Sequence, residues 1–420
     1  MANELTYLIE KLSKYLMTNK IIHVAPVLPP DEHQIEYALD SAGHQGTLVT
    51  SWIPTTFEYA MLRNLPVFRK RLRREPVRLR LRKADRHAWP DIRRFIDINL
   101  RTYPSTLLAH DAFFERVDRH AQKLISSETR VVIGREFGCR LAFLRARENG
   151  VSCVYHLPTV HHETLREILG REQELFSDVC RSTFDPFEFQ GERLLNKRAE
   201  IDMADAILCP SKFVEQSLLK EGIEAAKIKV APFGGEAAWL DVPRAQGTSP
   251  TFVFVGNISA RKGAHRLLQV WKQLQAYRTH KLLLVGEMHL KPSFLRNYSG
   301  LYEHLPRMPR EDLRDIYLRA SALVLPALAE GFALVIQEAL SCGTPVLASQ
   351  NSGAAGFLND EQARLFKAQD NDSLATSLEW ALTHPAELAA MGEAGRLKAR
   401  QWSWRSFKRA VQNEINVFAP

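Results

Sequence analysis

The feature that most constrains this chain is the regular alternation of short apolar runs with stretches of helical spacing. The stretches 194–204 and 212–221, for example, have apolar residues at helical intervals, with an apolar run on either side of each. Strands that alternate with helices usually form parallel sheets covered by helices on both faces. The chain is therefore predicted to be an α/β protein with doubly wound sheets. The predicted strands are 21–24, 46–49, 131–133, 151–155, 206–209, 228–231, 251–256, 281–286, 322–326 and 345–348.

The alternation is interrupted once, at residues 241–250. This stretch is polar and contains proline and glycine, which is typical of an interdomain linker, and a fresh alternation begins at residue 251. A length of 420 residues also suits two or three domains. Two doubly wound domains of similar size are the expected organisation.

The most informative motif holds two acids, Glu330 and Glu338, with Gly331 directly after the first. The motif follows the predicted strand 322–326, so the glycine loop opens a helix. A helix start has unpaired N–H groups and a partial positive charge, which suit a phosphate. Two carboxylates beside a phosphate would repel it unless they face hydroxyls, so the motif favours a nucleotide sugar. The alternative is an ordinary loop acid followed by a solvated helix acid.

A second motif follows the first strand of the second half and reads Gly256-Asn257-Ile258-Ser259-Ala260-Arg261-Lys262-Gly263. Glycine lets the backbone approach a ligand, and the adjacent Arg261 and Lys262 can neutralise a diphosphate. The alternative is a basic turn whose charges only meet solvent. In open parallel sheets ligands bind beyond the carboxyl ends of strands, which is where both motifs lie.

These motifs resemble the retaining GT-B glycosyltransferases of family 4, also called glycosyl transferases group 1. The E-x7-E spacing of Glu330 and Glu338 is similar to the signature of that family, and so are 205–214 and 232–235. The resemblance implies two Rossmann-like domains facing across a cleft, with a C-terminal helix that crosses back to the N-terminal domain. Residues 1–240 would bind the acceptor, 241–395 the nucleotide-sugar donor, and 396–420 would form the returning helix.

The resemblance also assigns roles to single residues. Glu330 takes the place of the acid that holds the donor sugar, and Glu338 that of the acid that binds the ribose hydroxyls. Lys262 matches the lysine that grips the pyrophosphate. The family usually has an arginine directly after the first glycine, where this chain has Asn257, so Arg261 is expected to supply that charge.

His156 ends the predicted strand 151–155, where the family has a histidine that reaches the donor hexose. A structural histidine is the alternative. The expected catalytic residues are Glu330, Lys262, Arg261 and His156. The expected donor-binding residues are Gly256, Asn257, Gly331, Phe332, Ala333, Leu334, Val335, Glu338, Arg307 and Met308.

The expected function is retaining transfer of a hexose-type sugar from a UDP- or GDP-sugar to a glycan or lipid-linked acceptor, in cell-surface polysaccharide or glycolipid synthesis. Arg261, Lys262 and the helix start at 333–335 would stabilise the departing diphosphate, so neither a metal nor another cofactor is expected. The one Asp-x-Asp, at Asp370 and Asp372, is interpreted as a loop or helix cap. The alternatives are a nucleotide-sugar epimerase, a glycan phosphorylase, a non-catalytic protein that binds anionic lipid or acidic glycan, or a nucleic-acid-binding protein.

Positive charge is concentrated between Arg63 and Arg94, within a net charge of +8. Such a stretch suits an anionic membrane surface or an acidic glycan, or is a solvated face without a partner. Aromatic residues are sparse in it, which disfavours single-stranded nucleic acid. Residues 5–16 have helical spacing and would either lie on a membrane or pack on their own domain.

The remaining features indicate a cytoplasmic protein, on the inner face of the membrane if the basic segment meets lipid. No apolar stretch approaches a membrane span of about 20 residues, and no signal peptide is apparent. The five cysteines lack the spacing of a zinc site and are expected to be free, mostly buried thiols. The loop 25–30 lacks the glycine pair that the family has there, so acceptor handling is expected to be unusual.

Overall fold

The computed structural model describes residues 20–53, 55–62, 79–103, 105–179, 189–235, 237–244 and 250–419. Among these, residues up to 157, 189–208 and those from 408 onward form one compact unit, and the others form a second. Each unit therefore draws on stretches that lie far apart in the sequence. The domain boundaries at residues 240 and 395 stay a prediction.

The first half of the chain builds a seven-stranded sheet with the order β3-β2-β1-β4-β5-β6-β7. Its register is parallel from β3 to β6, and Val24 of β1 pairs with both Val49 of β2 and Gly134 of β4. The strands are β1 (Lys20–Val24), β2 (Gly46–Ser51), β3 (Arg82–His87), β4 (Thr129–Arg135), β5 (Ser152–His156), β6 (Ala206–Cys209) and β7 (Ile228–Val230). The first unit's helices are α2 (Pro30–Ser41), α3 (Thr56–Leu62), α5 (Ala88–Asn99), α6 (Thr106–Leu124), α7 (Arg140–Glu148) and α9 (Gly191–Met203).

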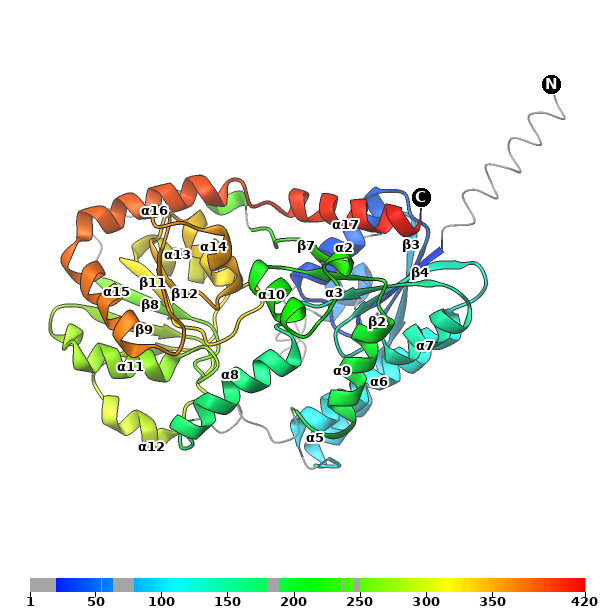
Figure 1. Ribbon diagram of the computed structural model, residues 1–420, viewed down its shortest axis with the longest axis horizontal. Coiled ribbons are helices and arrows are strands. Elements are labelled where there is room, and N and C mark those ends of the chain that lie inside the picture. Colours follow the sequence, from blue (N-terminus) through cyan, green and yellow to red (C-terminus); the bar gives the residue numbers. More distant parts are fainter. Residues whose placement is uncertain are drawn as a thin grey trace, which may run out of the picture. The chain divides into compact units, whose positions relative to one another are not determined.

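The second sheet is parallel throughout and has the order β10-β9-β8-β11-β12-β13. Its strands are β8 (Thr251–Val255), β9 (Lys281–Val285), β10 (Glu303–Leu305), β11 (Ala322–Leu325), β12 (Val346–Ser349) and β13 (Arg364–Phe366). The helices of this unit are α8 (His162–Leu175), α10 (Lys212–Lys220), α11 (Ala264–Gln273), α12 (Pro292–Leu295), α13 (Arg310–Arg319), α14 (Leu334–Ser341), α15 (Asn371–Thr383) and α16 (Pro385–Ala399). Helix α11 lies on one side of the sheet, and α13 and α14 lie on the other (Figure 1).

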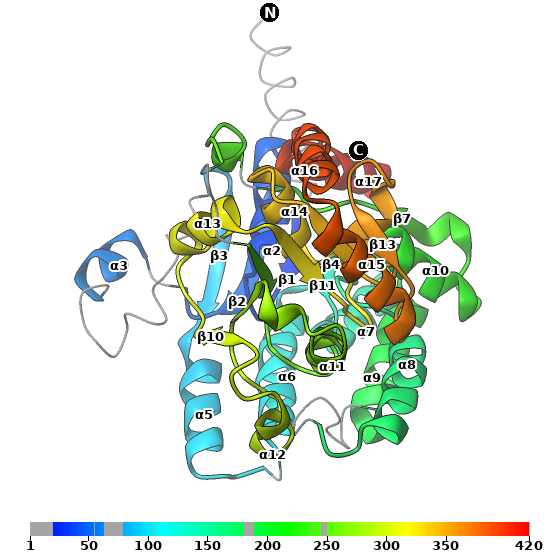
Figure 2. The same ribbon diagram turned by 90° about the vertical axis from the view of Figure 1, so that its left-hand side faces the viewer.

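The apolar runs of the sequence form the centres of both sheets. Ile21 and Ile22 of β1 are fully buried, as are Phe254 of β8 and Trp271 of α11. Burying side chains of this size contributes about 1.5–3 kcal/mol each. Helices lie on both faces of the central strands (Figure 2). The predicted α/β class with two doubly wound, parallel sheets is therefore confirmed.

The last helix, α17 (Trp404–Phe418), begins in the second unit, and its residues from Lys408 onward belong to the first. In the first unit Gln412 donates a hydrogen bond to the carbonyl of Ala38 on α2, at 2.9 Å. His44 and Asn416 form another contact, with Nε2 and Oδ1 3.1 Å apart. The predicted return of the final helix to the N-terminal part of the chain is confirmed.

The basic segment contains a strand that the sequence patterns did not indicate. Strand β3 is mostly charged because it is the edge strand of its sheet. Arg82, which the charge pattern grouped with surface cations, is buried and paired with Glu36 at 3.0 Å. Residues 63–78 and 5–16 lie outside the described residues.

Two smaller expectations concern the cysteines and the membrane. The four cysteines in the described ranges, Cys139, Cys153, Cys209 and Cys342, are free and buried as expected. Among the described residues no helix combines the length and the apolar character needed to cross a bilayer.

Candidate functional site

The order of the second sheet places its topological switch point between β8 and β11. The chain leaves β8 on one side, toward β9, and leaves β11 on the other, toward β12. Open parallel sheets bind ligands at the carboxyl ends of strands at such a point. The loops there are 256–263 and 326–333, and they contain both sequence motifs.

The two loops are bound to each other through Arg261 and Lys262. The backbone N–H of Leu328 donates to the carbonyl of Arg261 at 2.8 Å, and Arg261 Nε donates to the carbonyl of Ala329 at 3.1 Å. Lys262 Nζ lies 2.5 Å from Glu330 Oε2, and both side chains are only about one-sixth exposed, at 17% and 16%. Two residues that the sequence assigned to one site are therefore in direct contact.

This pair determines the charge state of Glu330. Burial by itself would raise the pKa of the carboxyl group, but Lys262 and Arg261 outweigh it and the pKa of Glu330 falls below its usual value. Glu330 is therefore ionised at neutral pH.

Each loop requires glycine at one position, because another part of the backbone approaches that position closely. Gly263 has φ 71°, and a Cβ built there would lie 1.8 Å from the carbonyl oxygen of Pro326. A Cβ on Gly331 would lie 1.9 Å from the carbonyl oxygen of Pro158. The carbonyl of Gly331 also accepts a 2.6 Å hydrogen bond from Ser211 Oγ. Pro158 and Ser211, which lie much earlier in the sequence, therefore help to fix the loop 326–333.

Helix α14 begins directly after this loop. Its N-cap residue Ala333 has φ 67° and carries no side-chain oxygen, so it cannot cap the first N–H groups of Leu334 and Val335. Phe332 is buried against Phe233, with ring centroids 5.3 Å apart. The start of α14 is thus held in place by the packing of Phe332, and its first backbone N–H groups suit an anion.

Glu338 lies one helical turn further along α14 and is held by two partners. Its Oε1 is 2.5 Å from Arg310 Nη2, and its Oε2 accepts a 3.3 Å hydrogen bond from the hydroxyl of buried Tyr317. Burial and the nearby Glu338 carboxylate raise the pKa of Tyr317, which keeps it a donor. Sequence reasoning missed both partners; the position of Arg310 at the start of the helix after β10 was the available signal.

The other expected donor residues lie at two places in the second unit. Gly256 has φ 128° and faces the side chain of Lys262, whose Cε would be 3.8 Å from a Cβ there. Asn257 is exposed at the tip of the same loop. Arg307 and Met308 lie apart from these loops, in the connection between β10 and α13. Asp370 caps α15 by accepting from Ser373 N at 2.9 Å, so the cap interpretation of the Asp-x-Asp is confirmed.

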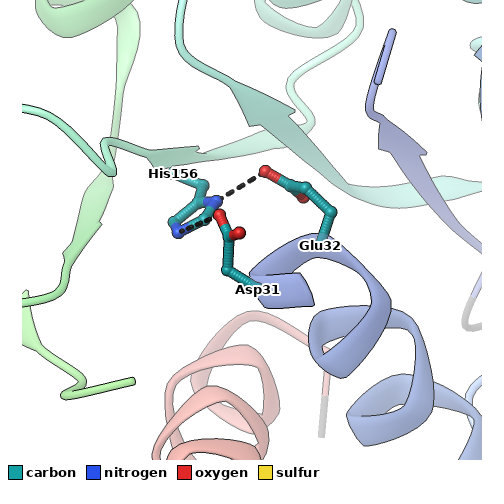
Figure 3. A group of neighbouring side chains, drawn as sticks. All are labelled: Asp31, Glu32 and His156. Carbon is teal, nitrogen blue, oxygen red and sulfur yellow. Dashed lines mark hydrogen bonds and ion pairs between the residues drawn. The ribbon is translucent and has the colours of Figure 1, made fainter. Parts of the chain in front are cut away.

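His156 lies in the first unit, at the carboxyl end of β5. Its Nδ1 is 2.7 Å from Glu32 Oε1, and its Nε2 is 3.9 Å from Asp31 Oδ2 (Figure 3). Asp31 and Glu32 begin α2, directly after the loop that follows β1. Strands β1 and β4 form the switch point of this sheet, so the cluster occupies the equivalent place in the first unit.

The cluster continues inward as a row of buried side chains with alternating charge. Arg135 contacts Asp31 at 2.8 Å and Glu32 at 2.6 Å. His23 joins Glu32 to Glu36, at 2.8 Å and 2.7 Å, and Glu36 in turn contacts Arg82. Burial alone would lower the pKa of His23, but its two carboxylate partners raise it to about 9.

Asp31, Glu32 and His156 are close enough together to be tested as a metal site. The guanidinium of Arg135 donates to both carboxylates, and Glu32 also accepts from the two histidines. The positive charge that a metal would supply is therefore already present, and these residues do not fit a metal ion.

Comparison with known structures agrees with this architecture. Sucrose-phosphate synthase from Thermosynechococcus elongatus is 19% identical, with a TM-score of 0.62 over 96% of this chain and 99% of that one. The lipopolysaccharide glycosyltransferase WaaG is 14% identical, with a TM-score of 0.61 over 94% and 99%. Anabaena HepE in complex with UDP-glucose is 14% identical, with a TM-score of 0.59 over 95% and 99%. The fold is the GT-B fold of glycosyltransferases.

Residues 237–398 match the family described as Glycosyl transferases group 1. A GDP-mannose-dependent phosphatidylinositol monomannoside mannosyltransferase of Corynebacterium glutamicum is 28% identical over 178 residues, which are 40% of this chain and 47% of that protein. A D-inositol 3-phosphate glycosyltransferase of Gordonia bronchialis is 25% identical over 255 residues, 53% and 56% of the two chains. The chain thus spans about half the length of these relatives.

Proposed function

We propose that this protein is a retaining glycosyltransferase of family 4 that moves a hexose from a UDP- or GDP-sugar to a glycan or lipid-linked acceptor. The observation that carries the proposal is the contact of Lys262 with Glu330 between two interlocked loops at the switch point of the second sheet. A cation for the diphosphate and an acid for the sugar hydroxyls are thereby brought to one place.

In this proposal, donor binding breaks the ion pair between Lys262 and Glu330. Lys262 then pairs with the diphosphate, and Glu330 accepts hydrogen bonds from the hydroxyls of the hexose. Lys262, Arg261 and the first amides of α14 then stabilise the charge that develops on the departing diphosphate. Because these groups already carry the compensating charge, the proposal includes no metal and no other cofactor.

Glu338 has a different part in the proposed site. Its carboxylate is fixed by Arg310 and Tyr317, so it can accept hydrogen bonds from ribose hydroxyls without changing its position. Arg307 and Met308, which precede Arg310, would lie beside the base. The name of the Corynebacterium relative supports GDP-mannose as a donor, and the UDP-glucose complex of HepE supports a UDP-sugar.

The proposed chemistry is substitution on one face of the sugar. The acceptor oxygen bonds to the anomeric carbon on the face from which the diphosphate leaves, and the leaving phosphate takes the acceptor proton. The ring orientation of His156, which the family resemblance assigns to the donor hexose, is fixed by Glu32. A covalent sugar adduct on any side chain of the protein would contradict this step.

The acceptor is proposed to bind the first unit, which has a cavity of about 510 Å³ beside the start of α7. Its lining is rich in hydrogen-bonding groups and includes Asp111, Glu192, Asn196 and the ring of Phe137. Such a mixture suits a polyhydroxylated molecule. Relatives named as acting on phosphatidylinositol mannoside, inositol phosphate and O-antigen support a role in cell-surface glycolipid or polysaccharide synthesis.

A membrane partner is also proposed, at the inner face of the cytoplasmic membrane. Helix α5 exposes Trp89, Ile92, Phe95 and Ile98, which recur every three residues along one side. Exposed cations Arg80, Lys83 and Arg86 come just before this helix. An apolar helix face next to positive charge suits an anionic lipid surface.

The test of the donor site is ligand-induced stabilisation with UDP- and GDP-sugars. A nucleotide sugar that binds the folded protein should raise its melting temperature, by an amount that grows with concentration. Lys262→Ala should remove this shift. The matched control is Lys272→Ala, on the exposed part of α11, which should keep it. A shift that persists in the Lys262 variant, or that no UDP- or GDP-sugar produces in the natural protein, would refute the proposal.

A further inference from the structure

Helix α8 follows β5 of the first sheet in sequence, yet it packs in the second unit. Its residue Glu172, three positions before the end of the helix, is fully buried. A buried carboxylate is costly unless it is fully hydrogen-bonded. The partners of Glu172 therefore indicate what the helix holds in place.

Glu172 accepts four hydrogen bonds, two at each oxygen. Its Oε1 lies 2.5 Å from His265 Nε2 and 2.7 Å from Arg266 Nε. Its Oε2 accepts from Arg266 Nη2 at 2.8 Å and from Gln369 Nε2 at 2.9 Å. Burial alone would raise the pKa of Glu172, but the hydrogen bonds from His265 and Arg266 lower it to about 2. The group is thus a permanent anion with no acceptor position to spare.

Two of these partners are the second and third residues of α11. This helix starts at Ala264, directly after Gly263, and Lys262 precedes that glycine. Glu172 therefore binds the first turn of α11, and the residues that it contacts there lie three and four positions after Lys262. Phe176 packs over the same turn: its ring centroid is 4.7 Å from that of His265 and 4.9 Å from Arg266 Cζ.

The charges of the cluster are set by its geometry. Burial lowers the pKa of His265, so its ring is neutral and donates through Nε2–H. Its Nδ1 is buried without a hydrogen-bond partner among the described residues. One carboxylate thus balances one guanidinium. A bidentate pair of this kind fixes position and angle more narrowly than apolar packing does.

We propose that Glu172 is a positioning residue for the loop 256–263: by holding the first turn of α11, it keeps Lys262 where a phosphate can reach it. This inference rests on the proposed donor site. It gives α8 a role in donor binding, although no residue of this helix belongs to the predicted donor motifs.

The test compares Glu172→Gln with Glu167→Gln on the same helix, where Glu167 is exposed and pairs with Lys220 and Arg171. Binding of the preferred nucleoside diphosphate is measured by calorimetry, and binding of the corresponding nucleoside by NMR titration. Glu172→Gln should weaken diphosphate binding about tenfold or more, since hydrogen bonds to charged groups are worth about 1.5–3 kcal/mol. Nucleoside binding should stay unchanged, and Glu167→Gln should match the natural protein in both.

Hydrogen exchange of residues 256–268 provides a readout that needs no ligand. Exchange there should become faster in Glu172→Gln and not in Glu167→Gln. If the Glu172 variant does not fold, Arg266→Lys, which keeps the charge and loses the two-pronged contact, is measured in its place. Unchanged exchange and diphosphate affinity, or equal weakening of nucleoside and diphosphate, would overturn the inference. A natural protein that binds no nucleoside diphosphate would refute the donor site, while exchange would still decide whether Glu172 orders the loop.

Discussion

At the scale of single residues, the charged side chains of both candidate sites form ion pairs with one another. Lys262 pairs with Glu330, Arg310 with Glu338, and Arg135 with Asp31 and Glu32. The sequence motifs predicted Lys262 and Glu330 for one site but not their mutual contact, because spacing along the chain does not reveal which side chains meet across two loops. The buried row from Arg82 to His156 was likewise unpredicted, since its members come from α2 and four different strands.

The buried row predicts a pH dependence of stability through His23. The pKa of this histidine is raised to about 9, so its stabilising contribution is complete below its unfolded pKa near 6.5 and is lost as the pH rises through 9. The pKa of Glu36 is lowered to about 2, because Arg82 and His23 outweigh burial; its contribution is complete above pH 4.5 and is lost as the pH falls toward 2.

The measurement is urea unfolding, followed by circular dichroism at pH 7 and pH 9.5. The natural protein should lose on the order of 3 kcal/mol between these values, since one pKa unit is worth about 1.4 kcal/mol. His23→Gln should be less stable at pH 7 and should lose much less on going to pH 9.5. An equally steep alkaline loss in both proteins would show that His23 does not cause it.

At the scale of elements, the strand and helix pattern was largely readable from the sequence. The predicted strands 21–24, 206–209 and 322–326 correspond closely to β1, β6 and β11. Apolar runs report burial, and these strands are buried on both faces. The charged edge strand β3 and the three-residue strands β10 and β13 lack that signal. The packing of α8 in the second unit could not be predicted, because it depends on Glu172 meeting residues about ninety positions away.

The loop that ends in Gly263 provides a test at this scale. Gly263→Ala must accommodate both a left-handed backbone and a collision with the carbonyl of Pro326. The control is Gly300→Ala, which has φ 78° and open space around the missing Cβ. Gly300→Ala should lower the free energy of unfolding by about 1 kcal/mol. Gly263→Ala should lower it by several kcal/mol and should also weaken nucleotide-sugar binding. Equal losses in thermal and urea unfolding would contradict the close approach of the loops.

The exposed face of α5 gives a second prediction about an element. Replacing Trp89 and Phe95 together by serine should abolish flotation with anionic phospholipid vesicles and leave stability within about 0.5 kcal/mol, since both side chains are mostly exposed. With vesicles of neutral phosphatidylcholine, the natural protein itself should float only weakly. Leu195→Ser on α9, another exposed apolar residue, is the control and should float normally. Undiminished flotation of the double variant would exclude α5 as the lipid-binding face.

At the scale of the whole molecule, α17 joins two compact units by contributing residues to both. Its last turns hold Val411 and Ile415, which are fully buried in the described structure, and Val417, which is 69% exposed. The sequence predicted this returning helix from its resemblance to a family, and not from the amphipathic pattern, which shows only that a helix is present.

This helix predicts a large difference between neighbouring substitutions. Ile415→Ala should destabilise the protein by about 2–5 kcal/mol, because it removes buried methylene groups and leaves a cavity. Val417→Ala, two residues further along, should change stability by less than about 0.5 kcal/mol. Urea unfolding monitored by circular dichroism measures both. Similar small effects of the two would mean that the end of α17 does not pack on the first unit.

The interleaving of the two units has a consequence for how the protein is made. Residues 408–419 complete the first unit, yet they are translated only after every residue of the second. During translation, the first unit therefore lacks its last helical segment until the whole second unit has been synthesised. For the same reason, residues 1–240 expressed alone would lack α17. The apolar surface that α17 covers near α2 would then be exposed and prone to aggregation.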